Sequence, residues 1–131
     1  PHIAGHSLDG KLRGTWMIRQ ALAHHCGQPS ELTFADICPP PALASLHLQH
    51  ALPPEDALRL CMRAVYDVRR DHDALERQTL HHGMRKGFDD CRANYPLRRE
   101  FATLNVRLSG EAVALEGILR GAGFAVTLAR L

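Results

Sequence analysis

The chain has 131 residues, of which 45% are hydrophobic and 23% are charged, with a formal net charge of +2. This length is typical of one domain, and the apolar fraction is sufficient for a core, which excludes a chain that is disordered throughout. No run approaches the roughly 20 apolar residues of a membrane span, and basic and acidic residues are interspersed, so neither a membrane protein nor strong electrostatic capture of nucleic acid is indicated.

A first helix is expected near the N-terminus. Ser7 or Asp9 can cap its start, because a short polar side chain accepts a hydrogen bond from a free backbone N–H of the first turn. Apolar residues then recur at helical spacing up to about Cys26. Gly27 and Pro29 follow at once, and both residues are typical of the end of a helix.

The next stretch gives weaker signals. Residues 31–38 fit a strand and a helical turn about equally well. Three consecutive prolines, residues 39–41, predict a stiff extended connector. A short helix is expected over residues 42–52, because leucines and histidines recur there three and four positions apart and two prolines follow.

The strongest helical signal covers residues 54–94. A proline followed by two acidic residues favours a helix start. Apolar residues then recur at alternating spacings of three and four, a heptad pattern that is typical of a helix–helix seam. Beyond Gly83 the apolar track changes phase, so we expect either a break near residues 81–83 or one long bent helix. We predict that the seam is an interaction surface, formed by Leu58, Cys61, Val65, Val68, His72 and Leu75.

The C-terminal part predicts a strand, a helix and a second strand. Apolar and polar residues alternate over 101–108, as in a half-buried strand. Ser109 is expected to cap a helix over residues 110–120, and alternation resumes over 124–131. Because two strands are not a stable sheet alone, either residues 32–38 add a third strand or a second subunit completes the sheet.

These elements predict the α+β fold class, with a helical N-terminal and central region packed on a small sheet. We expect a single domain over residues 1–131. Its three parts are helical segments with a proline-rich connector (1–53), a long helix or helix pair (54–95) and the strand–helix–strand unit (100–131).

Nine histidines are the compositional outlier and suggest a metal site as a hypothesis. Imidazole nitrogen and thiolate sulfur are ligands that zinc, nickel and copper accept. Such a site would join the end of the first helix to residues 42–52, using His24, His25, Cys26, His47 and His50. Neither a Cys₂His₂ nor an H-E-x-x-H spacing occurs, so solvated histidines and no cofactor are the favoured interpretation.

Other candidate chemistry is sparse. Ser109 and Gly110 lie between a strand end and a helix start, where free backbone N–H groups attract anions, although an ordinary N-cap is the simpler interpretation. Asp71, His72 and Asp73 are adjacent, and neighbours on a helix point in different directions. We therefore predict no catalytic residues.

Together these patterns predict a small bacterial regulatory or protein–protein interaction domain, which self-associates or binds a protein partner through the seam and the sheet edge. Arginine-rich, lysine-poor usage is typical of GC-rich bacterial genomes. Four cysteines without a C-x-x-C pair, and no signal peptide, indicate the cytoplasm. A transition-metal-binding regulator and a DNA-binding regulator are the alternatives, nucleic acid binding being possible but not indicated. An enzyme ranks last, because no two catalytic residue types converge.

Overall fold

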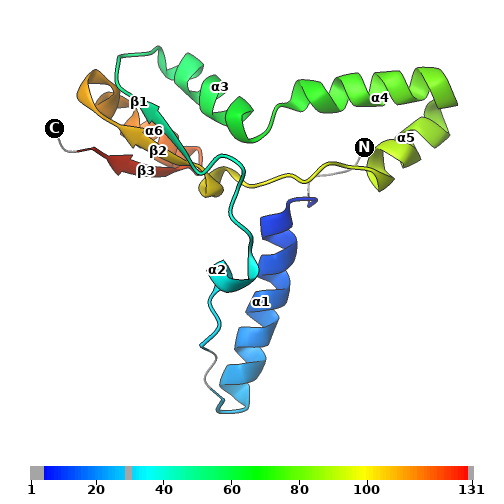
Figure 1. Cartoon of the computed structure of the whole chain (residues 1–131), viewed down its shortest axis with the longest axis horizontal. Coiled ribbons are helices and arrows are strands. Elements are labelled where there is room, and N and C mark those ends of the chain that lie inside the picture. Colours follow the sequence, from blue (N-terminus) through cyan, green and yellow to red (C-terminus); the bar gives the residue numbers. More distant parts are fainter. Residues whose placement is uncertain (1–4, 29–30, 130–131) are drawn as a thin grey trace.

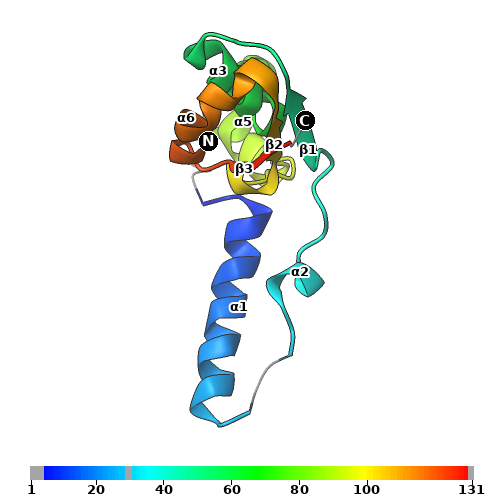
Figure 2. The same cartoon turned by 90° about the vertical axis from the view of Figure 1, so that its left-hand side faces the viewer.

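The computed structural model describes residues 5–28 and 31–129. Three parts extend in different directions: a small unit that contains the sheet, a helical hairpin beside it, and a long N-terminal helix that points away from both (Figures 1 and 2). Most of the regular structure is helical, and the sheet has three parallel strands, which confirms the α+β class. None of the described helices is long and apolar enough to cross a membrane.

The N-terminal helix, α1 (Leu8–His25), forms as predicted. The Ser7 side chain caps it by accepting a hydrogen bond from the Gly10 backbone N–H at 3.0 Å. Gly27, with a φ of 66°, follows its last turn in the left-handed region, where glycine is favoured. Met17, Ile18 and Leu22 remain exposed, so part of the apolar surface of α1 is uncovered in the described chain.

Residues 31–52 contain one helical turn and one strand, which decides the open alternative for residues 31–38 and contradicts the helix predicted over 42–52. A single helical turn, α2 (Phe34–Ile37), forms within 31–38, where the Asp36 carboxylate accepts a hydrogen bond from the Thr33 backbone N–H at 2.7 Å. The helix predicted over 42–52 is wrong, because this stretch contains strand β1 (Ser45–Leu48). Its leucine spacing is compatible with both periods, and pairing with a buried neighbouring strand decides between them.

The sheet has the order β1–β2–β3, with β2 (Asn105–Leu108) in the centre and β3 (Ala125–Leu128) at one edge. Leu46, Val106 and Val126 lie in one register row. The third strand therefore comes from β1, and neither residues 32–38 nor a second subunit is needed to supply it.

The core lies on one face of this sheet. It is covered by α3 (Pro54–Val65), by a 3-10 segment, η2 (Gly110–Leu115), and by α6 (Glu116–Gly121) (Figure 2). The helix predicted over 110–120 is thus a 3-10 segment followed by a short α-helix. The strand predicted from residue 101 starts only after a 3-10 turn, η1 (Phe101–Thr103).

The predicted long helix is three helices, α3, α4 (Val68–His82) and α5 (Met84–Ala93). Tyr66 is extended, and Asp67 caps α4 by accepting a hydrogen bond from the Arg69 N–H at 3.1 Å, which interrupts the heptad pattern. The second break, at Gly83, decides between the two alternatives left open for residues 81–83, a break or one long bent helix, in favour of the break.

The seam is consequently not one surface, and its role in interaction stays a prediction. The α3 residues of the seam pack toward the sheet, Cys61 being fully buried and Leu58 and Val65 partly so. On α4, by contrast, Val68 and His72 are exposed and Leu75 is half-buried. Extended backbone at Tyr66 turns the chain between the two groups.

Helices α4 and α5 form the hairpin, and a glycine sets how closely they pack. Gly87 on α5 is buried, and a Cβ atom built on it would lie 2.7 Å from the backbone of Gln78 and of Thr79 on α4. Because backbone atoms cannot move aside as a flexible side chain can, any larger residue must separate the two helices.

Replacing Gly87 with Ala should therefore destabilise the chain by about 2 kcal/mol, measured by urea unfolding, and should speed amide exchange in α5. Gly14→Ala is the matched control, since a Cβ at this α1 position meets nothing within 4 Å. The control should gain about 0.5–1 kcal/mol from its higher helix propensity. Equal stabilisation by both substitutions would contradict the close approach.

Candidate functional site

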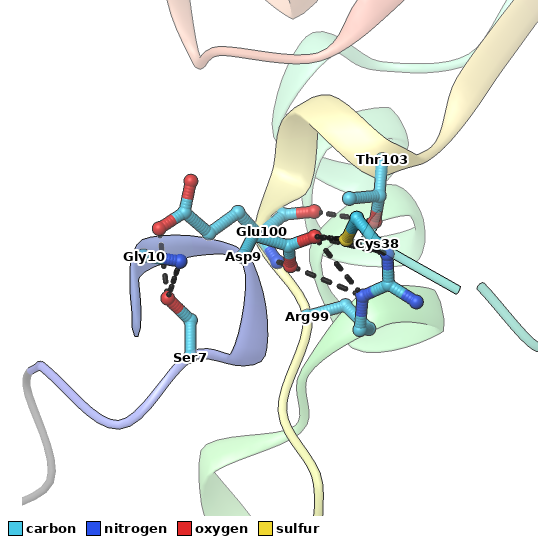
Figure 3. A network of polar contacts seen from close by, with 7 residues as sticks. All are labelled: Ser7, Asp9, Gly10, Cys38, Arg99, Glu100 and Thr103. Atoms are coloured by element: carbon cyan, nitrogen blue, oxygen red, sulfur yellow. Dashed lines mark hydrogen bonds and ion pairs between the residues drawn. The ribbon is translucent and has the colours of Figure 1, made fainter. Parts of the chain in front are cut away.

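The most densely connected group of buried polar side chains lies where α1 begins. The Leu8 N–H donates a hydrogen bond to the Arg98 carbonyl at 2.9 Å, and Ser7 pairs with Arg98 as an isolated parallel bridge. The Ser7 hydroxyl also donates to the Glu100 carboxylate at 2.8 Å. The first turn of α1 is thus joined to residues that follow the hairpin (Figure 3).

An ion pair between Asp9 and Arg99 forms the centre of this group. The two side chains are only 2% and 12% exposed. The Arg99 Nε donates to both carboxylate oxygens, at 3.1 and 3.2 Å, and its terminal nitrogen donates at 2.9 Å. The Glu100 backbone N–H adds a further bond of 2.9 Å.

These contacts decide the charge of Asp9. Burial opposes ionisation and by itself raises the pKa of this carboxyl, but the hydrogen bonds from Arg99, the Glu100 N–H and Cys38 together outweigh it. The pKa of Asp9 therefore lies below its usual value, and the residue is a carboxylate at neutral pH. Asp9 in turn raises the pKa of the Arg99 guanidinium.

Cys38 completes the group from the proline-rich connector. Its thiol donates to the Asp9 carboxylate, with sulfur and oxygen 3.4 Å apart. Burial and the Asp9 carboxylate both raise the pKa of this thiol, so it stays protonated and is a poor nucleophile. All four cysteines of the chain are free thiols.

The arrangement holds segments together and is not suited to acid–base chemistry. The Asp9 carboxylate is already occupied by donors from three residues, so it has no oxygen free to take a proton from a substrate. Within the described residues, no buried side-chain nitrogen or oxygen lacks a hydrogen-bond partner. We call these residues (Ser7, Asp9, Cys38, Arg99 and Glu100) the junction cluster.

A second polar group lies at the root of the hairpin. The hydroxyls of Tyr66 and Tyr95 both donate to one oxygen of the Asp71 carboxylate, the latter at 2.9 Å. Burial, and then the Asp71 carboxylate, raises the pKa of both tyrosines, so the hydroxyls remain donors. The Arg98 guanidinium lies 5.0 Å from the centre of the Tyr66 ring, which links this group to the junction cluster.

The structure does not bring the candidate metal ligands together. His24 and His25 lie in the last turn of α1 and Cys26 follows it, whereas His47 is on β1 and His50 comes after it. Figures 1 and 2 show the far end of α1 well separated from β1. In residues 5–28 and 31–129, no three histidine, cysteine or acidic side chains are placed to hold a metal ion.

The candidate anion site at Ser109 and Gly110 is a packed turn. The Ser109 hydroxyl shares a hydrogen bond of 2.9 Å with Nε2 of His47, so it caps no helix. Gly110 has a φ of 55°, and a Cβ there would lie 2.9 Å from the Gln49 carbonyl oxygen. The helical segment that follows is a short 3-10 turn with little dipole to attract an anion.

Sequence reasoning missed the junction cluster. Asp9 appears in the sequence only as a helix cap or first-turn acid, and Arg99 only as one of a basic pair. They are 90 residues apart, and no local spacing relates them. A pairing of this kind becomes visible only when the path of the whole chain is known.

Comparison with known proteins places these features in a family. Residues 37–118 match the model of a family described as "Domain of unknown function (DUF3410)". The chain belongs to this family. The matched residues include β1, the hairpin and β2, whereas α1 lies outside them.

Curated relatives resemble nearly the whole chain. Proteins named erythronate-4-phosphate dehydrogenase from Chromohalobacter salexigens, Azotobacter vinelandii and Pseudomonas fluorescens are 48%, 46% and 44% identical to it, over 98%, 94% and 94% of the chain. The chain covers 33% of each of these proteins. It thus spans about a third of the length of the curated relatives it matches.

These relatives correct the functional prediction. A regulatory or protein–protein interaction domain was expected, with metal-binding and DNA-binding regulators as alternatives, but the similar proteins are named as enzymes. The low rank given to an enzyme followed from the lack of converging catalytic residues in a sequence that spans only a third of its relatives. The bacterial origin indicated by composition agrees with these relatives.

Loss of the Asp9 charge should destabilise the chain in a pH-dependent way. Because Asp9→Asn leaves Arg99 buried without its counter-ion, we expect a loss of about 3 kcal/mol at neutral pH, measured by urea unfolding. The folded pKa of Asp9 lies below the unfolded value of about 3.9, so its contribution is complete above that value and is lost as the pH falls through the folded pKa. The difference in free energy of unfolding between wild type and Asp9→Asn should therefore be constant above about pH 5 and should decrease below pH 4.

Asp56→Asn is the matched control, because Asp56 pairs with Arg59 at 2.9 Å while both side chains are 55% exposed. It should cost less than about 1 kcal/mol. A loss as small for Asp9→Asn as for Asp56→Asn would show that Arg99 is not left as an uncompensated buried charge.

Proposed function

We propose that the chain is part of an erythronate-4-phosphate dehydrogenase and that the complete protein oxidises erythronate 4-phosphate. The observation that carries this proposal is the 42–48% identity to proteins of that name, over at least 94% of the chain. A dehydrogenase removes a hydride and a proton from a hydroxyl group, and the hydride passes to a nicotinamide or flavin acceptor.

Within that enzyme, we assign a supporting role to the part of the chain described here. The most buried charged side chains in this part, Asp9 and Arg99, are already paired with each other in the junction cluster. The sequence also has no G-x-G-x-x-G or P-loop phosphate-binding motif. Substrate and acceptor would accordingly bind mainly to the remainder of the longer protein.

The protein should act in the bacterial cytoplasm. Its four cysteines are free thiols, and such thiols persist in a reducing compartment.

Self-association is a second proposal, and the hairpin is the element that favours it. Leu80 and Met84, which flank the hairpin turn, are 79% and 76% exposed, and Val68 on α4 is 63% exposed. Exposed apolar side chains are common singly, but here they lie on one element that projects from the sheet unit (Figure 1). We propose that a second copy of the protein covers the turn of the hairpin at Leu80 and Met84.

The first test is enzymatic. The complete protein, supplied with NAD and with a flavin acceptor in separate assays, should oxidise erythronate 4-phosphate, and product formation should be measured directly by mass spectrometry. Erythronate without its phosphate is the control substrate and should react far more slowly. A complete, folded protein without activity toward the phosphorylated substrate would contradict the proposed function.

The second test concerns association. Leu80→Asp combined with Met84→Asp should lower the solution mass of the complete protein to that of one copy, because two buried carboxylates would be unpaired in the interface. Leu60→Asp is the control, since Leu60 is also exposed but lies on α3, away from the hairpin. Light scattering coupled to gel filtration measures the mass. An unchanged mass for the double variant would place the interface elsewhere.

A further inference from the structure

Three consecutive residues connect the three parts of the molecule. The Arg98 side chain lies over the Tyr66 ring at the root of the hairpin. Arg99 binds Asp9 in the first turn of α1, and Glu100 accepts a hydrogen bond from Ser7, which caps that helix. Immediately afterwards the chain enters the sheet unit through η1 and β2. The direction in which α1 leaves the sheet unit is therefore set at residues 98–100.

The length of α1 makes this connection sensitive. A helix of 18 residues is about 27 Å long, so a rotation of about 10° at its first turn would move its far end by about 5 Å. Further along, α1 packs against the single turn of α2, where the Trp16 and Phe34 rings meet edge to face with their centroids 5.9 Å apart. A forked arginine–carboxylate pair resists such a rotation, because it fixes the plane of both groups.

One side of α1 also exposes apolar residues that another part of a protein could cover. Trp16 and Gln20 face residue Leu32, to whose carbonyl both donate hydrogen bonds. Ile18 and Leu22, one helical turn apart on another side, are exposed. Because α1 lies outside the family match and the relatives are three times as long as this chain, the remainder of the dehydrogenase is the occupant that fits this side.

We propose that Asp9 and Arg99 are a positioning pair: they fix the direction of α1 relative to the sheet unit, and α1 thereby orients the remainder of the dehydrogenase. The effect on catalysis rests on the proposed function, whereas the effect on the direction of α1 does not. Neither residue contacts the reacting atoms in this scheme. They act through α1, in whose first turn Asp9 lies.

The direction of α1 can be measured in the complete protein. Unnatural amino acids that carry nitroxide labels would replace His25, at the end of α1, and Thr127, on β3, and pulsed electron paramagnetic resonance would give the distribution of distances between them. Arg99→Met removes the ion pair. Arg59→Met is the matched control, because it removes an exposed arginine–aspartate pair on α3.

We expect a narrow distribution for the wild type and for Arg59→Met, and a broadened or shifted one for Arg99→Met with amide protection in β2 retained. Turnover of erythronate 4-phosphate by Arg99→Met should fall by about tenfold with little change in KM. If Arg99→Met does not fold, Arg99→Lys keeps the charge but not the fork, and it should broaden the distribution to a smaller extent.

An unchanged distance distribution in a folded Arg99→Met or Arg99→Lys protein would overturn the proposal. So would a changed distribution with unchanged turnover, because α1 would then not orient the catalytic part. Inactivity of the wild type contradicts the proposed function instead, and the distance measurement still decides whether the pair sets the direction of α1.

Discussion

The buried ion pair between Asp9 and Arg99 is the contact on which the arrangement of the molecule depends. A carboxylate that is 2% exposed is stable only when its hydration is replaced, and here the replacement comes from Arg99, the Glu100 N–H and Cys38. These donors reside on two segments far from Asp9 in sequence. Hydrogen bonds to this one carboxylate therefore hold together the start of α1, Cys38 before the three prolines, and the segment between the hairpin and η1.

Outside this junction the molecule has an uneven distribution of packing. The sheet unit has a core of apolar side chains from β2, α3 and α6, and its sheet is buried on one face. The hairpin is held instead by close backbone contact at Gly87 and by the tyrosine–aspartate group at its root. Its tip and one side of α1 expose large apolar residues. The two proposals made above give these surfaces their cover: the remainder of a longer protein for α1, and a second copy for the hairpin.

The sequence was sufficient to predict the starts and ends of helices where these depend on capping residues and glycines. The cap at Ser7, the end of α1 and the break at Gly83 could all be predicted, because capping and glycine chemistry are local. The strand β1 could not, since its leucines fit both periods and only pairing with β2 decides. The heptad seam was misleading for a related reason: the apolar residues of α3 and α4 continue one pattern, but extended backbone at Tyr66 sends them to different surroundings. The junction cluster had no local signal, because Asp9 and Arg99 are 90 residues apart.

The junction cluster joins residues on both sides of the boundary of the family match. Residues 37–118 include Cys38 and Arg99 but exclude Asp9, so the ion pair crosses the edge of the matched segment. A buried charge pair at the edge of an independent, flexibly linked unit would add little net stability, because the cost of desolvating both charges offsets their attraction. Its effect is geometric: the forked contact selects one orientation of α1 among many that a linker would permit. The relatives retain similarity on both sides of this boundary, as expected if α1 and the matched segment form one rigid body.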